Sequence, residues 1–417
     1  MVWKGINHVL PITKQKKTLF YPVYGIILAT LLTGCHFNNN STVHSTEYPI
    51  TIDLAEAIRN KIKIKLSDIV DSITYVPVES MIDDYITHLN SSKMQFSQNY
   101  VISEGYRSRG DLVLYDRNGR FIRKVAQKGQ GPGEYSGMND IAIDEKHEIV
   151  YVLSASLRKL FKYNLEGIFL GVIDLSDFID DVSNPPTRIA VSSSGQILVN
   201  YSNWTGNLQY RCLLFDHQGN LINRLKNYLF YTGELTSLSF EGKAYIYKNQ
   251  IHVKNYCDTL FVVDNDNFKP KYVFRHGKNQ SNYITCSEYK EIGRQVDAGD
   301  LFETDSKVFF SFGYNNRFLY AFYDKNEGKT YSISDEFLKY NDDGLSFPPL
   351  CVFSGSQLND ETILILGVDY IDRNGLKEHL SSSKYLNITN MLDSILSVDD
   401  DPVVLSVFHL KKNYPNK

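Results

Sequence analysis

The feature that most constrains the fold is a ten-residue pattern that recurs along most of the chain. Each copy has an apolar run, an Asp or Asn, two further residues, a Gly or Asn, and a second apolar run, and the clearest copies are 112–121, 160–169 and 212–221. The apolar runs suit paired strands, while the Asp or Asn side chain caps the turn and the Gly or Asn supplies its positive φ angle. Each copy therefore predicts an antiparallel β-hairpin.

The spacing of these hairpins predicts the architecture. The turn anchors Asp116, Asn164, Asp216, Asp264 and Asp324 lie 48, 52, 48 and 60 residues apart, and two further short strands precede each hairpin. Four antiparallel strands in about fifty residues is the size of one propeller blade. The copies begin near residues 93, 139, 187, 242, 301 and 352. The sequence thus predicts an all-β fold, a six-bladed β-propeller of four-stranded antiparallel blades.

The two ends of the repeat region predict how the propeller closes. The last copy ends with the apolar strand 403–408 and lacks an outer strand, whereas 73–78 is a strand without a blade. Pairing the two strands would hide both exposed edges, which otherwise promote aggregation. We therefore expect the N-terminal strand to pair with the C-terminal blade. Two β-sandwich domains are the alternative, and the even period through residues 93–370 disfavours them.

Composition excludes several classes of protein. The formal net charge is −4, too close to neutral for a nucleic-acid binder that depends on phosphate neutralisation. Only residues 19–33 are apolar enough to meet a bilayer, so a polytopic membrane protein is excluded. The 29 Tyr and 23 Phe favour strands over helices. These values describe a β-rich globular protein.

The N-terminus has the character of a secretory signal. A basic leader with Lys14, Lys16 and Lys17 precedes an apolar run that ends in Leu32-Thr33-Gly34-Cys35. These four residues resemble the bacterial lipobox, in which the cysteine thiol is acylated and becomes the new N-terminus, so we expect lipidation of Cys35. The predicted organisation is a signal peptide at 1–34, a tether at 35–61 and the propeller at 62–411, with a helical insertion at 376–397 in the last blade.

The residues after Cys35 bear on location. His36 stands where lipoproteins retained in the inner membrane carry Asp, and no acidic residue occurs before Glu47. We therefore expect a lipid-anchored protein of the outer membrane that faces the periplasm, with exposure at the cell surface as the alternative. The pairing of the remaining cysteines stays open; they are Cys212, Cys257, Cys286 and Cys351.

Three segments carry a resemblance to a known family. They are 66–79 (LSDIVDSITYVPVE), 129–135 (GQGPGEY) and 401–404 (DPVV). On these segments the chain resembles the six-bladed β-propeller lipoproteins of Bacteroidetes-type bacteria, which are related in shape to NHL-repeat propellers. The resemblance implies an extracytoplasmic protein that belongs with nutrient-uptake and glycan-utilisation systems, and it brings no catalytic residues. The run 129–135 is itself expected to be a structural turn between blades, with Glu134 capping an amide.

Candidate contacts follow from the loops. In a blade with strands A to D, the B–C and D–A loops share one face of the disc, and long loops on a rigid scaffold are where binding concentrates. Aromatic rings stack on sugars and guanidinium groups clamp carboxylates or sulfates, so a rim rich in both suits a glycan, a peptide or a partner protein. The predicted ligand contacts from the B–C loops are Arg107, Arg109, Arg158, Trp204, Tyr256, Tyr314 and Arg317.

Motifs for catalysis are largely missing from the sequence. It contains no His-Glu-x-x-His and no Gly-x-Ser-x-Gly, and Ser381-x-x-Lys384 lies in a serine-rich insertion where the match is by chance. Asp264-Asn265-Asp266 suits a hairpin turn better than a calcium loop. We expect no cofactor, no metal site and a monomer. The predicted function is a non-catalytic envelope lipoprotein with a binding face. The alternative is a polysaccharide hydrolase or lyase with carboxylates at the channel mouth.

Overall fold

The structure is a computed structural model, and it describes residues 49–79, 81–82, 85–86, 89–105, 110–179, 181–228, 230, 243–255, 258–275, 301–314, 317–334, 356–359, 361–367 and 403–411. The chain divides into two units at residues 45 and 46, and all described residues belong to the second. Nearly all of the elements in the described part are strands, and twelve of the 28 strands form three four-stranded antiparallel sheets. The helical insertion expected at 376–397 lies outside the described residues.

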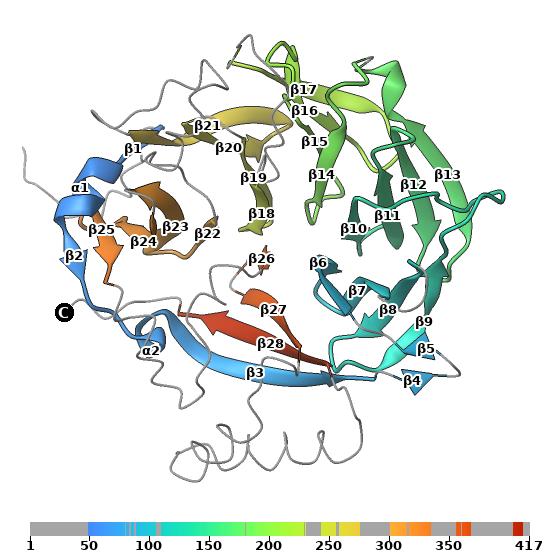
Figure 1. The fold of residues 1–417 in the computed structure, drawn as a ribbon, viewed down its shortest axis with the longest axis horizontal. Coiled ribbons are helices and arrows are strands. Elements are labelled where there is room, and N and C mark those ends of the chain that lie inside the picture. The colour runs from blue at the N-terminus through green and yellow to red at the C-terminus, as the bar shows by residue number, and fades with distance from the viewer. Residues whose placement is uncertain are drawn as a thin grey trace, which may run out of the picture. The chain divides into compact units, whose positions relative to one another are not determined.

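Three sheets contain four strands each, in simple up-and-down order (Figure 1). In each sheet the first strand is innermost and the fourth is outermost. The strands are β6 (Leu89–Phe96), β7 (Tyr100–Gly105), β8 (Leu112–Asp116) and β9 (Phe121–Ala126); β10 (Asp140–Asp144), β11 (Ile149–Ser154), β12 (Lys159–Asn164) and β13 (Phe169–Asp174); and β14 (Pro186–Val191), β15 (Ile197–Tyr201), β16 (Tyr210–Phe215) and β17 (Leu221–Lys226).

The other two large sheets combine repeat strands with strands from the N-terminal segment. One has the order β2-β25-β24-β23-β22, and the other β1-β21-β20-β19-β18-β26-β27-β28-β3. Their strands are β1 (Ile50–Asp53), β2 (Lys61–Ile62), β3 (Val70–Val78), β18 (Lys243–Tyr247), β19 (Gln250–Lys254), β20 (Thr259–Asp264), β21 (Asn267–Arg275), β22 (Leu301–Glu303), β23 (Lys307–Tyr314), β24 (Arg317–Asp324), β25 (Lys329–Ile333), β26 (Ser356–Leu358), β27 (Glu361–Gly367) and β28 (Val403–Leu410).

Short elements complete the described chain. They are α1 (Leu54–Arg59), α2 (Leu66–Ile69), the 3-10 helix η1 (Leu175–Asp177) and the hairpin of β4 (Met81–Ile82) and β5 (Tyr85–Ile86). Among the described residues, none of the helices is long and apolar enough to cross a bilayer.

The innermost strands face a common centre, as in a propeller (Figure 1). β10 contacts β6 on one side and β14 on the other, β14 contacts β18, and β18 contacts both β22 and β26. The buried clusters lie between neighbouring sheets: one joins Tyr151 and Leu160 of the β10–β13 sheet to Tyr201 and Phe215 of the β14–β17 sheet. The many Tyr and Phe residues thus fill the space between blades.

The repeated hairpins form as their sequence predicts. Asp216 Oδ1 accepts hydrogen bonds from the backbone N–H groups of Gln218, Gly219 and Asn220 at 2.8–2.9 Å. Gly219 has a φ of 101°, in the left-handed region that disfavours a side chain. Asp116 caps the same turn of its own hairpin in the same way, through the amides of Asn118 and Arg120. The turn anchors Asp116 and Asp216 are therefore confirmed.

The N-terminal segment pairs with strands from the far end of the chain. β3 is antiparallel to β28, with Val76 opposite Leu405 and Thr74 opposite Val407. This pairing of residues 73–78 with 403–408 is the one that the sequence predicts. β3 thereby serves as the outer strand beside β26, β27 and β28.

The predicted tether at 35–61 needs correction at its C-terminal end. β1 adds in parallel to β21, and β2 adds in parallel to β25. Between them, α1 is capped by Asp53, whose Oδ1 accepts from Ala55 and Glu56 N–H, and it buries Leu54 and Ala57. Residues 50–61 therefore belong to the folded domain. Their apolar pattern is too short to predict strands, and they are stabilised by pairing with the outer edges of β21 and β25 and by the burial of Leu54 and Ala57.

Candidate functional site

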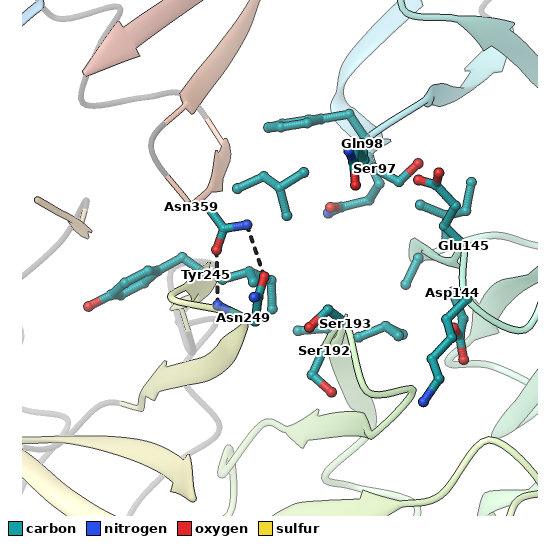
Figure 2. A pocket seen from close by; sticks show the side chains of 18 of the residues that line it. Ser97, Gln98, Asp144, Glu145, Ser192, Ser193, Tyr245, Asn249 and Asn359 are labelled. Atoms are coloured by element: carbon teal, nitrogen blue, oxygen red, sulfur yellow. Dashed lines mark hydrogen bonds between the residues drawn. The ribbon is translucent and has the colours of Figure 1, made fainter. Parts of the chain in front are cut away.

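A cavity of about 380 Å³ opens at the centre of the described sheets (Figure 2). Its wall comes from the innermost strands β6, β10, β14, β18 and β26, and its rim from the turns that connect these strands to the next. We call this cavity the central pocket. It is lined by residues 95–98, 142–146, 189–193, 244–246, 249, 358 and 359.

The lining combines an apolar wall with a polar rim. Ile143, Ile246 and Leu358 contribute aliphatic side chains, whereas the rim carries amides, hydroxyls and one Lys beside one Glu. Figure 2 shows labelled side chains from several turns around the opening, among them Gln98, Glu145, Ser193 and Asn249. An apolar interior with a few polar groups at its mouth is typical of small-molecule and peptide sites.

One side of the pocket is sealed by an asparagine pair. Asn249 N–H donates to Asn359 Oδ1 at 2.9 Å, and Asn359 Nδ2 donates to Asn249 Oδ1 at 3.1 Å (Figure 2). Directly below, Ile246 of β18 forms a parallel bridge with Leu358 of β26. β22 contributes no residue to the pocket lining. The pocket is therefore bounded by five innermost strands.

The two carboxylates of the pocket lie side by side on one turn. Asp144 is buried, accepts from His147 N–H at 3.2 Å and pairs with His147 Nδ1 at 2.8 Å. Glu145 Oε2 accepts from Asn99 N–H at 3.2 Å. The His147 ring in turn stacks on His217, with 3.9 Å between ring centroids. Asp144 thus holds His147 within its own turn, and Glu145 joins this turn to the one that carries Asn99.

A second polar cluster is buried behind the pocket wall. Glu303, 1% exposed, accepts from Lys271, Lys325, Tyr272 and Tyr245 at 2.7–3.1 Å. Burial by itself would raise the pKa of Glu303, but the charges of Lys325 and Lys271 lower this pKa to about 2. The carboxylate therefore stays ionised. Because Tyr245 also lines the pocket, this cluster holds one part of the wall in place.

Neutral His252 completes the cluster. Burial and the charge of Lys271 lower the pKa of His252 to about 3. Its Nε2 lies 2.9 Å from Lys271 Nζ and its Nδ1 lies 3.1 Å from the carbonyl oxygen of Gln250. An ammonium group can only donate. Nε2 therefore accepts and Nδ1–H donates.

The sequence-predicted contacts lie on other loops. Arg158 belongs to the turn between β11 and β12, Trp204 to the turn between β15 and β16, and Tyr314 ends β23; Trp204 and Tyr314 are half-buried. These turns join second to third strands, at the opposite strand ends from the pocket rim. Arg107, Arg109, Tyr256 and the lipidation residue Cys35 lie outside the described residues, and only the backbone of Arg317, which begins β24, is described.

The structure brings only part of this set together. The charge of Arg158 acts on the hydroxyl of Tyr201, the last residue of β15, although burial still raises the pKa of Tyr201. Trp204 follows Tyr201 by three residues, so Arg158 acts on the strand that leads into the Trp204 turn. Tyr314 belongs to a different sheet. The β11–β12 turn has four residues, no more than the hairpin turn of the same sheet, so the expectation of longer B–C loops holds for 202–209 and not for 155–158.

Sequence analysis missed the rim of the central pocket. Its short turns between first and second strands carry no aromatic or arginine side chains, the residue types on which the predicted contacts depend. One usable signal was present: Asn249 and Asn359 both have positive φ angles, 61° and 52°, and Asn is the residue that tolerates them best after Gly. An asparagine beside the first strand or the second strand therefore marks the rim in two repeats: Asn249 directly precedes β19 and Asn359 directly follows β26.

Three further features outside the central pocket bear on the sequence-based expectations: the run 129–135, the possible metal ligands and Cys212. Glu134 Oε2 accepts from Gly131 N–H at 2.8 Å, and a Cβ atom at Gly129 would lie 1.9 Å from the same carboxylate, so the run 129–135 is a structural turn as expected. In the part of the chain that the structure describes, no three His, Cys, Asp or Glu side chains gather closely enough to hold a metal ion. Cys212 is buried, and its thiol donates to Asn200 Oδ1 at 3.2 Å.

Comparisons with known proteins support the fold. A family model described as a domain of unknown function, DUF4934, matches residues 49–408. A crystal structure from Bacteroides fragilis, of a protein whose name proposes export from the cell, is similar with a TM-score of 0.61 at 16% identity, covering 87% of this chain and 99% of that one. A DUF4221 family member from Bacteroides vulgatus has a TM-score of 0.49 at 10% identity, covering 82% and 98%. No curated protein matches the chain.

Proposed function

We propose that this chain, which belongs to the DUF4934 family of domains of unknown function, is a lipid-anchored binding protein of the cell envelope. Its β-propeller takes a small ligand in the central pocket. The carrying observation is the pocket itself: five innermost strands and their turns surround about 380 Å³, within the size range of ligand sites.

Six blades are part of this proposal. Four of the five large sheet groups begin with an innermost strand and end with an outer one, and the nine-stranded sheet divides naturally into two. β18–β21 form one antiparallel group and β26–β28 with β3 form another. Among the described residues, the strand pairing that joins the two groups is a single parallel bridge, that of Ile246 and Leu358. The pairing of β3 with β28 then closes the ring.

Location in the envelope rests on the N-terminus. The lipobox-like residues before Cys35 support acylation, and the B. fragilis neighbour is named for export. We place the protein at the outer membrane, facing the periplasm, as a monomer that serves a nutrient-uptake system. A Cys35→Ala variant should lose labelling by an alkyne fatty acid and leave the membrane fraction; retention of label and of membrane association would reject the anchor.

Binding without catalysis is the better supported activity. A glycosidase needs two carboxylates that flank the scissile bond from separate positions. Asp144 and Glu145 are adjacent on one turn and are engaged by His147 and Asn99. The pocket therefore supports recognition, with the rim amides and hydroxyls as donors and acceptors.

The test compares two neighbouring serines of the same turn, one of which lines the pocket. Ser193 is exposed on the rim and lines the pocket, whereas its neighbour Ser194 is exposed and does not. Binding to a panel of oligosaccharides and tripeptides, measured by thermal shift, should be lost in Ser193→Trp and kept in Ser194→Trp. The indole of the first variant fills the pocket, and the second adds the same bulk beside it.

The sequence-predicted contacts provide the opposing arm. A double variant Arg158→Ala/Trp204→Ala alters the β11–β12 and β15–β16 turns and should keep binding. If this variant loses binding at an unchanged melting temperature while Ser193→Trp keeps it, the ligand occupies the B–C face, and the central-pocket assignment is wrong.

A further inference from the structure

The central pocket is bounded by strand edges as well as by side chains. β6, β10 and β14 are each the first strand of their sheet, and among the described residues each pairs with a strand on one side only. All three contribute lining residues. An edge strand presents every second N–H and C=O to its open side. The pocket therefore meets backbone hydrogen-bonding groups.

The contacts of β14 show which groups face inward. Ile189 N–H donates to Asp140 Oδ2 of β10 at 2.8 Å, so at this residue the open edge of β14 faces β10. Because backbone direction alternates along a strand, Val191 presents its N–H and C=O to the same side, the one that faces β10. Val191 lines the pocket. Asp140 accepts the hydrogen bond of the Ile189 N–H, whereas the N–H and C=O of Val191 face the pocket.

The aromatic residues of the lining offer no platform for a sugar. Phe96 is 6% exposed, and the guanidinium of Arg117 lies over its ring, 5.5 Å from the centroid. Tyr245 is 3% exposed and stacks on His252, with 4.9 Å between centroids. Sugar recognition uses exposed aromatic faces for stacking. In the lining of this pocket, protein groups already cover these faces.

An extended segment already pairs with an innermost strand beside the pocket. The three-residue strand β26 lies parallel to β18 through the bridge of Ile246 and Leu358, and Asn359 N–H donates to the Ile246 carbonyl at 2.8 Å. An innermost edge of this fold thus accepts a short parallel strand. The edges of β10 and β14 have the same character and face the cavity.

We propose that the ligand of the central pocket is a short extended peptide with small apolar side chains. This inference rests on the proposed function of the pocket. The peptide backbone pairs with the open edge of β14 at Val191 and of β10 near Ile143, as in strand addition to a sheet edge. Its side chains contact Ile246 and Leu358, and its ends reach the polar rim at Glu145 and Lys146. A free oligopeptide and the end of a protein chain share this chemistry.

The experiment uses the full-length chain and a backbone-specific probe. Acetyl-Ala-Val-Ala-amide is titrated by calorimetry against its analogue with an N-methylated Val, and maltotriose serves as the sugar probe. Loss of the one peptide N–H should weaken binding by up to about tenfold, which corresponds to about 1.4 kcal/mol, near the upper end of the net contribution of one hydrogen bond. Amide hydrogen exchange at residues 141–145 and 189–193 should slow with the parent peptide. Ala-Val-Ala at the C-terminus of a carrier protein distinguishes a protein end from a free peptide.

Each outcome decides a separate point. Equal affinity for the parent and N-methyl peptides, or no binding of the parent, overturns the peptide assignment. Maltotriose binding that Ser193→Trp abolishes, without peptide binding, also overturns it but leaves the pocket as the binding site. Parent-peptide binding that is equal in wild type, Ser193→Trp and Ser194→Trp rejects the pocket as well. Slowed exchange confined to 141–145 and 189–193, together with the tenfold loss, supports strand pairing.

Discussion

At the scale of single residues, Glu303 is the position that depends most on its hydrogen-bonding and charged partners. Its carboxylate is buried against two lysines, and the side chains of Lys271 and Lys325 are themselves only 9% and 19% exposed. Buried charges are tolerated when they are paired and hydrogen-bonded, and removal of one partner leaves an uncompensated charge. The cluster joins β21, β22 and β24–β25, so this pairing stabilises the packing of two sheets behind the pocket.

Glu303→Gln should therefore destabilise the domain by about 3–5 kcal/mol in urea unfolding at pH 7. The folded pKa of Glu303, about 2, lies below the value of about 4.3 in an unfolded chain, so its contribution is complete above the unfolded pKa and is lost as the pH falls through the folded one. The deficit of the variant should be constant above pH 5 and narrow below pH 4. Glu166→Gln, at an exposed position, is the control and should change stability little. A deficit that does not depend on pH would contradict the ion-pair account.

At the scale of elements, the hairpin turn is the repeating unit of stability. In four of the repeats an Asp or Asn side chain accepts from backbone N–H groups of its own turn; the anchors are Asp116, Asn164, Asp216 and Asp324. Each capped turn sets the register of two strands, and register decides which side chains face the neighbouring blade. Local chemistry thus fixes the alternation that the blade packing needs.

Asp216→Ala should lower the free energy of unfolding by about 1–3 kcal/mol, because three backbone donors lose a charged acceptor. Asp216→Asn keeps an acceptor oxygen at the same position and should lose less than half of that amount. Thermal unfolding of the two variants side by side measures the difference. Equal losses would mean that the charge of Asp216, and not the geometry of its bonds, stabilises the turn.

At the scale of the whole molecule, the pairing of β3 with β28 joins residues more than three hundred positions apart. It covers the edge of β28, buries Val76 and Leu405 in one cluster, and leaves no repeat strand at that sheet edge among the described residues. Such a contact has a large loop-closure cost, which only the combined burial of the last sheet offsets. The domain should therefore unfold as one unit.

A disulfide across this seam tests the closure. Ser72 and His409 are directly opposite each other in β3 and β28. Ser72→Cys/His409→Cys should cross-link on oxidation and gain about 2–4 kcal/mol of stability relative to its reduced form, since the bond constrains a long loop of the unfolded chain. The single variant Ser72→Cys under the same conditions is the control. Absence of the cross-link would mean that the two ends are not paired.

Much of the fold was readable from local patterns. The spacing of the capped hairpins predicted four-stranded antiparallel sheets, and the unpartnered strands 73–78 and 403–408 predicted the pairing of the chain ends, because turn chemistry and strand alternation are short-range properties. The addition of β1 and β2 to outer edges was missed, since two or four residues carry no periodicity and depend on edges formed elsewhere.

The sequence by itself determined the repeated unit, its turns and the way the ends meet, because these follow from residues close together or from an obvious unpaired strand. Only the tertiary structure decided where a ligand could enter. The central pocket depends on the backbone edges of β6, β10 and β14 and on the contact of Ile246 with Leu358. Backbone N–H and C=O groups are the same for almost every residue type, so the sequence does not reveal which edges line a pocket. The Glu303 cluster likewise gathers charges from separate repeats, because burial makes their pairing obligatory once the sheets pack.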